Sequence, residues 1–228
     1  MISSLANLMH SIRHSLLPRF SIRFDKSPID TMGKLGFFIH TRSAYVAQTS
    51  LYGYLKTRMG TQFRDMFTDD NYVKSINLAK WRVYGSCLSD LTVFVCATIA
   101  KDAELSREET IDLARQSYAR CVLETYAECE DASLANELIN KFNEHSESVL
   151  WANAAIGETA FTRSPVDLVT WAPIADELKR YDHKIVSNSI RFRWRDVRSQ
   201  LRNRLAPDAI VLDWRGAKAG LHGNQAVN

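Results

Sequence analysis

The chain has 228 residues, of which 46% are hydrophobic and 24% are charged, and its formal net charge is +3 at pH 7. This composition is typical of a globular protein and argues against a disordered one, and a chain of this length can fold without a metal or disulfide staple. Only 9 glycines and 5 prolines are present, which argues against an all-β fold with its many Gly- and Pro-rich turns.

The first 24 residues form a basic segment without a single aspartate or glutamate. Apolar side chains recur at helical spacing from Ile2 to Leu16, and Pro18 ends this pattern because proline cannot continue a helix interior. The segment fits an amphipathic helix on a membrane or partner surface, a helix that folds back onto the core, or a mitochondrial targeting peptide. We therefore predict a basic amphipathic N-terminal segment over residues 1–30. Its candidate anchor residues are Ile2, Leu5, Ile12, Arg13, Leu16, Arg19 and Arg23.

Two long helical patterns follow this segment. The spacing of apolar residues over 36–60 predicts a helix that Gly60 terminates. The pattern from Tyr72 to Ala100 begins amphipathic and becomes apolar nearly all round, which is typical of a central core helix. Its longest apolar run, residues 91–100, is well short of the ~20 residues that cross a bilayer, so we expect no membrane-spanning helix.

The next helix has the clearest start signal in the chain. Ser106 and Glu109 have the spacing of a capping box, in which each side chain accepts a hydrogen bond from the backbone amide of the other residue. Asp131 is expected to cap a further helix. Residues 148–165 predict a short helix followed by a loop.

Two prolines delimit the predicted elements at the C-terminal end. Pro173 fits the first turn of a long helix that continues to about Leu205 and that Pro207 stops. Residues 207–228 are Gly-rich and predict a tail with one docked aromatic side chain. All these patterns together predict an all-α protein, with a single irregular domain of about six or seven helices over residues 31–206.

The cysteines give an indication of the redox compartment. Their separations match neither a zinc site nor a thioredoxin motif, and three of them lie in apolar helical stretches where a free thiol behaves as a small hydrophobic group. We expect buried thiols in a reducing compartment, the cytoplasm, with peripheral attachment to the inner face of a membrane or the mitochondrial matrix as alternatives. The four residues are Cys87, Cys96, Cys121 and Cys129.

Charge is distributed unevenly along the chain. Residues 1–64 hold nine Lys and Arg against two acids, residues 101–147 hold five against twelve, and residues 179–205 hold nine against two. The small overall charge therefore conceals two basic regions and an acidic middle region. A layout of this kind suggests contacts with an anionic partner or attraction between segments of the chain.

The second basic region contains a regular series of cations, which we name the basic stripe. Its members recur at steps of three, four or seven residues and share one face of the predicted helix, beside an apolar ridge that runs from Ile190 to Leu201. Arginine predominates over lysine, which suits bidentate contacts with carboxylate or phosphate. The face could dock nucleic acid, anionic lipid or an acidic partner helix, pack on the acidic residues 101–147, or be solvated. The candidate partner- or anion-binding residues are Arg180, Lys184, Arg191, Arg195, Arg198 and Arg202.

No catalytic, cofactor or metal-binding motif is recognisable in the sequence, so we predict no cofactor and no metal site. His40, Ser86 and Ser89 are the main candidates for a hydrolytic grouping that needs no local motif. Asp90 lies within the most apolar helix, and because an unpaired buried carboxylate costs several kcal/mol, we expect it to be paired with a basic or hydroxyl side chain.

The sequence therefore favours a non-catalytic helical adaptor or accessory protein that docks through its basic surfaces on an anionic membrane face or a larger protein assembly. The expected partner is another protein or a second copy of the chain, with an anionic membrane as a further possibility. The alternatives are a helical enzyme, most plausibly a hydrolase, and a nucleic-acid-binding helical protein.

Overall fold

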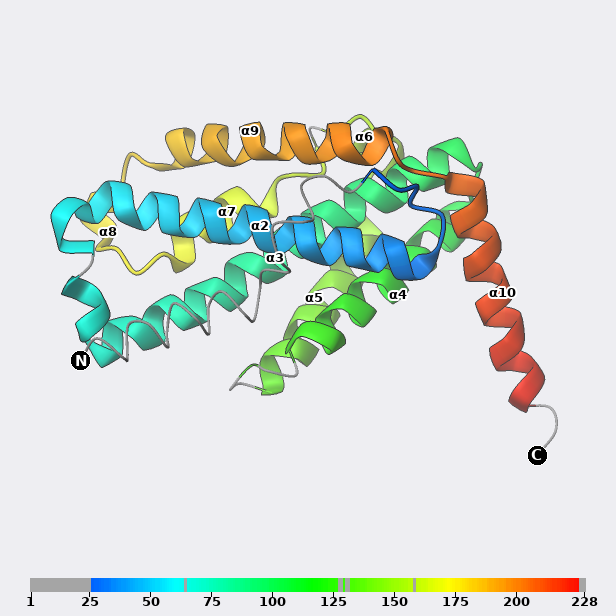
Figure 1. The fold of residues 1–228 in the computed structure, drawn as a ribbon, viewed down its shortest axis with the longest axis horizontal. Coiled ribbons are helices and arrows are strands. Elements are labelled where there is room, and N and C mark those ends of the chain that lie inside the picture. Colours follow the sequence, from blue (N-terminus) through cyan, green and yellow to red (C-terminus); the bar gives the residue numbers. More distant parts are fainter. Residues whose placement is uncertain (1–25, 64, 127–128, 130–131, 158, 226–228) are drawn as a thin grey trace.

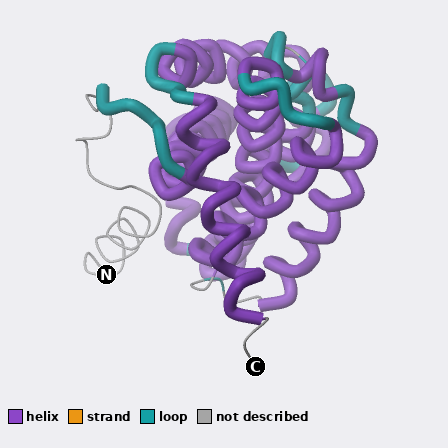
Figure 2. The backbone as a smooth tube through the Cα atoms, turned by 90° about the vertical axis from the view of Figure 1, so that its right-hand side faces the viewer, coloured by secondary structure: helices purple, strands orange, loops and turns teal. Residues whose placement is uncertain are grey.

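The computed structural model describes residues 26–63, 65–126, 129, 132–157 and 159–225. Within these residues the fold is all-α, as predicted, and Figure 2 shows helices joined by loops with no strand among them. The nine α-helices in this part of the chain exceed the predicted six or seven, because two helices of four residues each, α6 and α8, carry little periodic signal. The α-helices are α2 (Met32–Met59), α3 (Asp70–Asp102), α4 (Arg107–Tyr126), α5 (Ala132–Ser148), α6 (Trp151–Ala154), α7 (Arg163–Trp171), α8 (Asp176–Lys179), α9 (His183–Arg202) and α10 (Pro207–Gln225).

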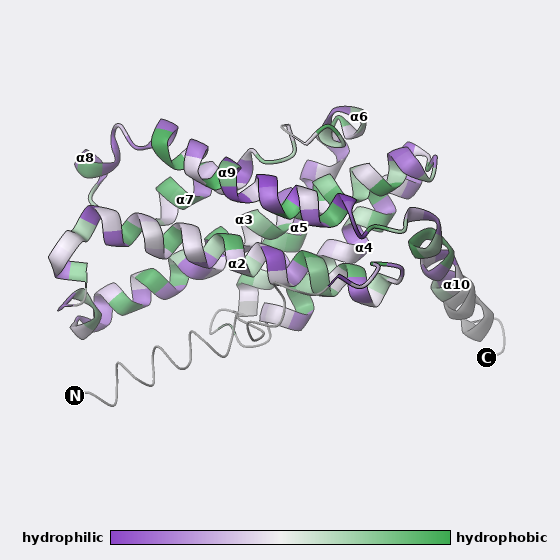
Figure 3. Ribbon diagram, turned by 45° about the horizontal axis from the view of Figure 1, so that its top comes forward, coloured by the Kyte–Doolittle hydropathy of each residue, from purple (hydrophilic) through white to green (hydrophobic). Residues whose placement is uncertain are grey.

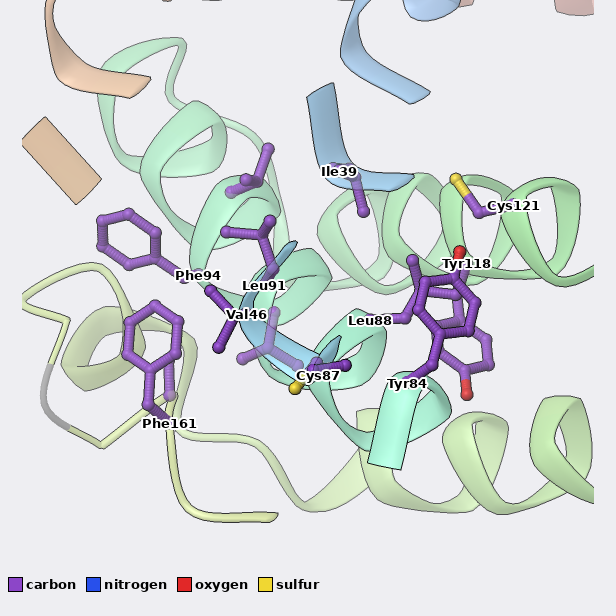
Figure 4. Packing of buried hydrophobic residues seen from close by; sticks show 14 of the residues in the cluster. Ile39, Val46, Tyr84, Cys87, Leu88, Leu91, Phe94, Tyr118, Cys121 and Phe161 are labelled. Carbon is purple, nitrogen blue, oxygen red and sulfur yellow. The ribbon is translucent and has the colours of Figure 1, made fainter. Parts of the chain in front are cut away.

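Helix α3 is the centre of the molecule. Every residue from Val83 to Ile99 is buried, and α2, α4, α6 and α7 pack around it. Figure 4 shows Leu88, Leu91 and Phe94 of this helix among buried side chains from the surrounding elements. By length and composition alone α3 is apolar enough to cross a membrane, but its most apolar window is entirely covered by the rest of the protein.

Two helix ends predicted from local signals, at Ser106 and Gly60, are confirmed, whereas the predicted cap Asp131 lies outside the described residues. Ser106 and Glu109 form the reciprocal capping box, with the Glu109 amide 3.1 Å from Ser106 Oγ and the Ser106 amide 3.0 Å from Glu109 Oε2. Gly60 follows the last residue of α2 with φ at 53°, a conformation that side chains with a Cβ rarely adopt. The Asp69 side chain caps α3 by accepting hydrogen bonds from the backbone amides of Asn71 and Tyr72.

The long helix predicted from Pro173 to Leu205 is wrong. The chain instead forms α8, a turn over residues 180–182, and α9. The short helix and following loop predicted over residues 148–165 are present as α6 and the residues after it, but the loop ends before Pro165, which lies in the first turn of α7. Proline is compatible with a helix start as well as a helix end, so sequence pattern alone assigned both prolines to the wrong element.

The tail predicted over residues 207–228 is helical as far as Gln225. Pro207 starts α10 rather than only stopping the preceding helix, and the helix buries Ile210, Val211 and Trp214. The Trp214 indole Nε1 donates to Gln116 Oε1 of α4 at 3.0 Å. The docked aromatic is thus part of an amphipathic helix that packs on the bundle. The seven candidate anchor residues of the N-terminal segment lie outside the described residues.

Candidate functional site: the outer face of α9 and a polar cavity

Helix α9 attaches to the bundle through one apolar face. Its buried residues recur every three or four positions and pack against α2 and α7. The Trp194 ring stacks on Phe161 with centroids 4.8 Å apart, and its Nε1 donates to Ser164 Oγ at 3.2 Å. Figure 1 shows α9 alongside α2 at one edge of the molecule, with α4 and α5 beyond α2 and α3. The buried residues are Val186, Ile190, Trp194, Val197 and Leu201.

The basic stripe flanks this buried face. Because a helix turns by about 100° per residue, the arginines that directly follow the ridge residues Ile190, Trp194 and Leu201 project to one side of α9. Arg180 does not belong to this face, since it lies in the turn before α9. Arg198 is half-buried, and its Nη1 lies so close to Gly157 that a Cβ there would be 2.6 Å away.

Exposed apolar side chains lie next to the stripe, and the sequence analysis missed them. The exposed fractions of Ile185 and Phe192 are 70% and 59%, and their seven-residue spacing places them on the same side of α9. The Arg195 guanidinium lies over the Phe192 ring, 4.3 Å from its centroid. Figure 3 shows strongly hydrophobic and strongly hydrophilic residues close together along this helix. We define the α9 outer face as Lys184, Ile185, Arg191, Phe192, Arg195 and Arg202, all of which are exposed.

The described acids of the middle region do not neutralise this face. Among the described residues, the carboxylate within ion-pair distance of the face is that of Asp196, 3.9 Å from Arg195 and itself exposed. Acids of α4 and α5 pair elsewhere: Arg115 with Glu147 at 2.6 Å, Arg215 with Glu109 at 2.7 Å, Arg82 with Glu137 at 2.5 Å, and Lys218 with Asp112. Packing of the stripe on residues 101–147 of its own chain is therefore not what the structure shows.

Asp182 fixes the start of α9 against α2. Its carboxylate is 2% exposed and accepts hydrogen bonds from Tyr54 Oη and Arg58 Nε, each at 2.6 Å. Both partners lie in the last turns of α2. This ion pair, in which Asp182 is buried, and the apolar ridge hold the outer face in a defined orientation on the bundle.

A polar cavity of about 580 Å³ lies between α3, α5 and α7, away from the outer face. Ser86 and Ser89 both line it, and Ser86 Oγ donates a hydrogen bond to Asp167. His40 lines a different cavity, between α2 and α4, and its Nδ1 lies 2.8 Å from Tyr84 Oη. The structure therefore does not bring His40 together with the two serines as a hydrolytic grouping.

Asp90 is buried and paired with a hydroxyl side chain, that of Ser164, as predicted, and it also binds two backbone amides that were not foreseen. Its carboxylate is 1% exposed and accepts hydrogen bonds from the backbone amides of Ser164 at 2.9 Å and Arg163 at 3.2 Å. The carboxylate therefore caps the start of α7. Burial raises the pKa of Asp90 to about 7, and hydrogen bonds from Ser164 and Arg163 oppose this effect only in part.

No family model, curated protein or solved structure matches the chain. Within the described residues, no group of three or more His, Cys, Asp and Glu side chains is arranged to hold a metal ion. The two features that remain as candidate sites are the α9 outer face and the polar cavity.

Proposed function

We propose that the protein is a non-catalytic helical adaptor that docks an acidic segment of another protein on the α9 outer face. The observation that carries this proposal is the combination, on one exposed surface, of the large apolar side chains Ile185 and Phe192 with arginines whose one carboxylate neighbour among the described residues is the exposed Asp196. Exposed apolar groups bordered by polar residues are typical of interaction surfaces.

The kinds of residue on this face favour a protein partner over a lipid surface. Protein interfaces are enriched in arginine and aromatic residues and depleted in lysine, whereas an anionic bilayer attracts both cations alike. Three of the four cations on the face are arginines. The planar guanidinium can bind a carboxylate through two parallel hydrogen bonds, which gives the partner's acidic side chains a defined position.

The two classes of side chain would make different contributions to binding. Burying Ile185 or Phe192 fully is worth about 1.5–3 kcal/mol each, so these residues are expected to supply most of the affinity. Arginines at the edge of an interface mainly raise the association rate and select the partner by charge. The complex should accordingly weaken as salt screens the charges, without being abolished.

A photoreactive side chain at Asn188, which is exposed on α9, would identify the partner in the protein's own cells. Leu212 is the matched control, since it is 76% exposed on α10. We expect adducts at position 188 that are absent at position 212, on a segment rich in aspartate and glutamate. A partner without such a segment, or equal labelling at the two positions, contradicts the proposal.

The identified segment then permits a quantitative test with purified proteins. Arg191→Glu/Arg195→Glu is expected to weaken binding about tenfold to a hundredfold at low salt, because each reversal places like charges together. Lys56→Glu/Lys74→Glu is the control, since it changes the net charge equally at exposed positions of α2 and α3. Restoration of binding by reversing the partner's acids would support direct contact.

Two outcomes of these measurements would overturn the proposal. Equal weakening by both double variants would mean that only net charge matters. The second is a result with phosphatidylserine vesicles. If the protein sediments with them, Arg191→Glu/Arg195→Glu abolishes this sedimentation, and no acidic protein partner is found, the face belongs to a membrane surface instead.

A further inference from the structure

We propose that the cavity between α3, α5 and α7 binds a small organic acid with one carboxylate and a hydroxyl or amino group. Its volume of about 580 Å³ falls within the range of small-molecule sites. The proposal does not depend on the α9 outer face, which lies on a different part of the protein.

The cavity has a rigid wall on one side. The rings of Tyr118 and Phe142 stack in parallel with centroids 4.0 Å apart, and both are almost completely buried. On the side of α7, the Arg82 guanidinium lies over the Trp171 ring at 4.7 Å. A ligand would therefore meet apolar surfaces that are already held in place, which reduces the entropy cost of binding.

Ser89 and Arg163 are two of the polar residues in this cavity whose polar groups have no partner within the described part of the protein. Ser89 is 3% exposed, lines the cavity, and its Oγ makes no hydrogen bond. Arg163 also lines the cavity, but its guanidinium forms neither an ion pair nor a hydrogen bond with a described residue. A buried hydroxyl without a hydrogen bond is costly, so a ligand that accepts from Ser89 would recover this loss.

The other cations of the cavity share one carboxylate, whereas Arg163 contacts none among the described residues, which makes Arg163 the anchor for an anion. Arg82 and Lys141 both contact Glu137 Oε1, at 2.5 and 2.6 Å. The guanidinium of Arg163 can bind a carboxylate in a bidentate manner. We therefore place the ligand's carboxylate at Arg163.

The acidic residues of the lining limit the charge of the ligand. Glu144 and Asp167 face the same cavity, and they would repel a phosphate ester or a second carboxylate. The same oxygens can accept hydrogen bonds from a hydroxyl or amino group. A monocarboxylate with such a group can bind both Arg163 and the two acidic residues, whereas a polyanion can bind only Arg163.

His145 provides a signal that distinguishes this arrangement from simple filling of the cavity. Burial, followed by the positive charge of Arg163, lowers the pKa of this histidine. The charged groups that face the cavity with it are Arg82, Lys141, Glu144, Arg163 and Asp167. A carboxylate at Arg163 would compensate the guanidinium charge, so the His145 pKa should rise on binding.

The test uses a panel of hydroxy- and amino-monocarboxylates, including 4-hydroxyphenylacetate, each paired with its neutral amide. Binding to the full chain is followed by NMR at millimolar concentrations. We expect at least one acid to shift the Ser89 amide and raise the His145 pKa, with its amide binding about tenfold more weakly. Inorganic phosphate should bind more weakly than that acid.

Substitutions at two residues, Arg163 and Ser89, test the residue assignments. Arg163→Gln should remove the preference for acid over amide, and Arg163→Lys should restore part of it. Ser89→Ala should weaken binding several-fold while leaving thermal stability unchanged or higher, because it removes a buried hydroxyl without a partner. Lys56→Gln, far from the cavity on exposed α2 surface, should change nothing. The proposal is overturned if no acid in the panel shifts Ser89 and His145, if acids and amides bind equally, or if both cavity variants bind like the wild type.

Discussion

Replacing Asp90 with alanine is expected to lower the free energy of unfolding by about 3 kcal/mol. The carboxylate is buried and holds the first turn of α7 through the amides of Arg163 and Ser164. Alanine would leave both donors unpaired in the interior and would remove the contact that fixes α7 against α3. Urea unfolding of the wild type and Asp90→Ala, followed by circular dichroism, measures the difference. A loss below about 1 kcal/mol would show that water or another side chain replaces the cap.

The contribution of Asp90 to the free energy of unfolding depends on pH, and the sign of this dependence follows from its pKa. Because the pKa of Asp90 is raised to about 7 in the folded state, the folded protein binds this proton more tightly than the unfolded chain does. Its contribution to stability is therefore present below the unfolded pKa near 4 and is lost as the pH rises through 7, by an amount on the order of 4 kcal/mol.

Asp90→Asn is the matched control for this pH dependence. Asparagine has nearly the same shape and can still accept a hydrogen bond from an amide of α7, but it does not titrate. The wild type should therefore lose stability relative to Asp90→Asn between pH 5 and 8. His40 and His145, whose pKa values are lowered by burial, are present in both proteins and cancel in the comparison. A constant difference over this range would contradict the raised pKa.

Asp182→Ala is expected to cost about 2–3 kcal/mol and to loosen the start of α9. The substitution leaves the Arg58 guanidinium and the Tyr54 hydroxyl without the carboxylate that joins α2 to the turn before α9. The loss is limited because the Arg58 side chain is 36% exposed and is partly solvated when unpaired. Hydrogen exchange should show faster exchange in the first turns of α9 and unchanged protection in α3.

A second aspartate in the same region serves as a control for this loss. Asp176 contacts Lys179 at 3.3 Å, but its side chain is 94% exposed, so Asp176→Ala should change stability by less than about 0.5 kcal/mol. Similar losses for both variants would show that the burial of Asp182 does not determine its contribution.

The sequence predicted best those elements whose signals are local. The capping box at Ser106 and the glycine at position 60 act within one helical turn, so their effect depends little on the rest of the fold. The helix ends were predicted less well from the prolines at positions 165, 173 and 207. The same residue type can start or stop a helix, and neighbouring helices determine which of the two occurs.

The candidate sites show where pattern analysis stops. Helical spacing correctly placed most of the basic stripe on one face, but it could not show which acids lie opposite that face. Ile185 and Phe192 are apolar and helically spaced, and a sequence pattern interprets such residues as core. The cavity was not foreseen at all. Ser89 and Arg163 are 74 positions apart and meet only because α3 and α7 pack together.

The complete burial of α3 from Val83 to Ile99 predicts how this part of the helix tolerates substitution. A helix covered on every side offers no tolerant face, so a scan of substitutions should find few acceptable changes at any position from Val83 to Ile99. At Gly85 even one added carbon would lie 3.0 Å from Leu138 and from the Tyr126 hydroxyl. Along α9 the same scan should show tolerance that rises and falls every three to four residues. A helix in lipid would accept exchanges among leucine, isoleucine, valine and phenylalanine on its outer side, and α3 should reject most of them. Variation among natural sequences can therefore distinguish a core helix from a membrane helix of the same composition.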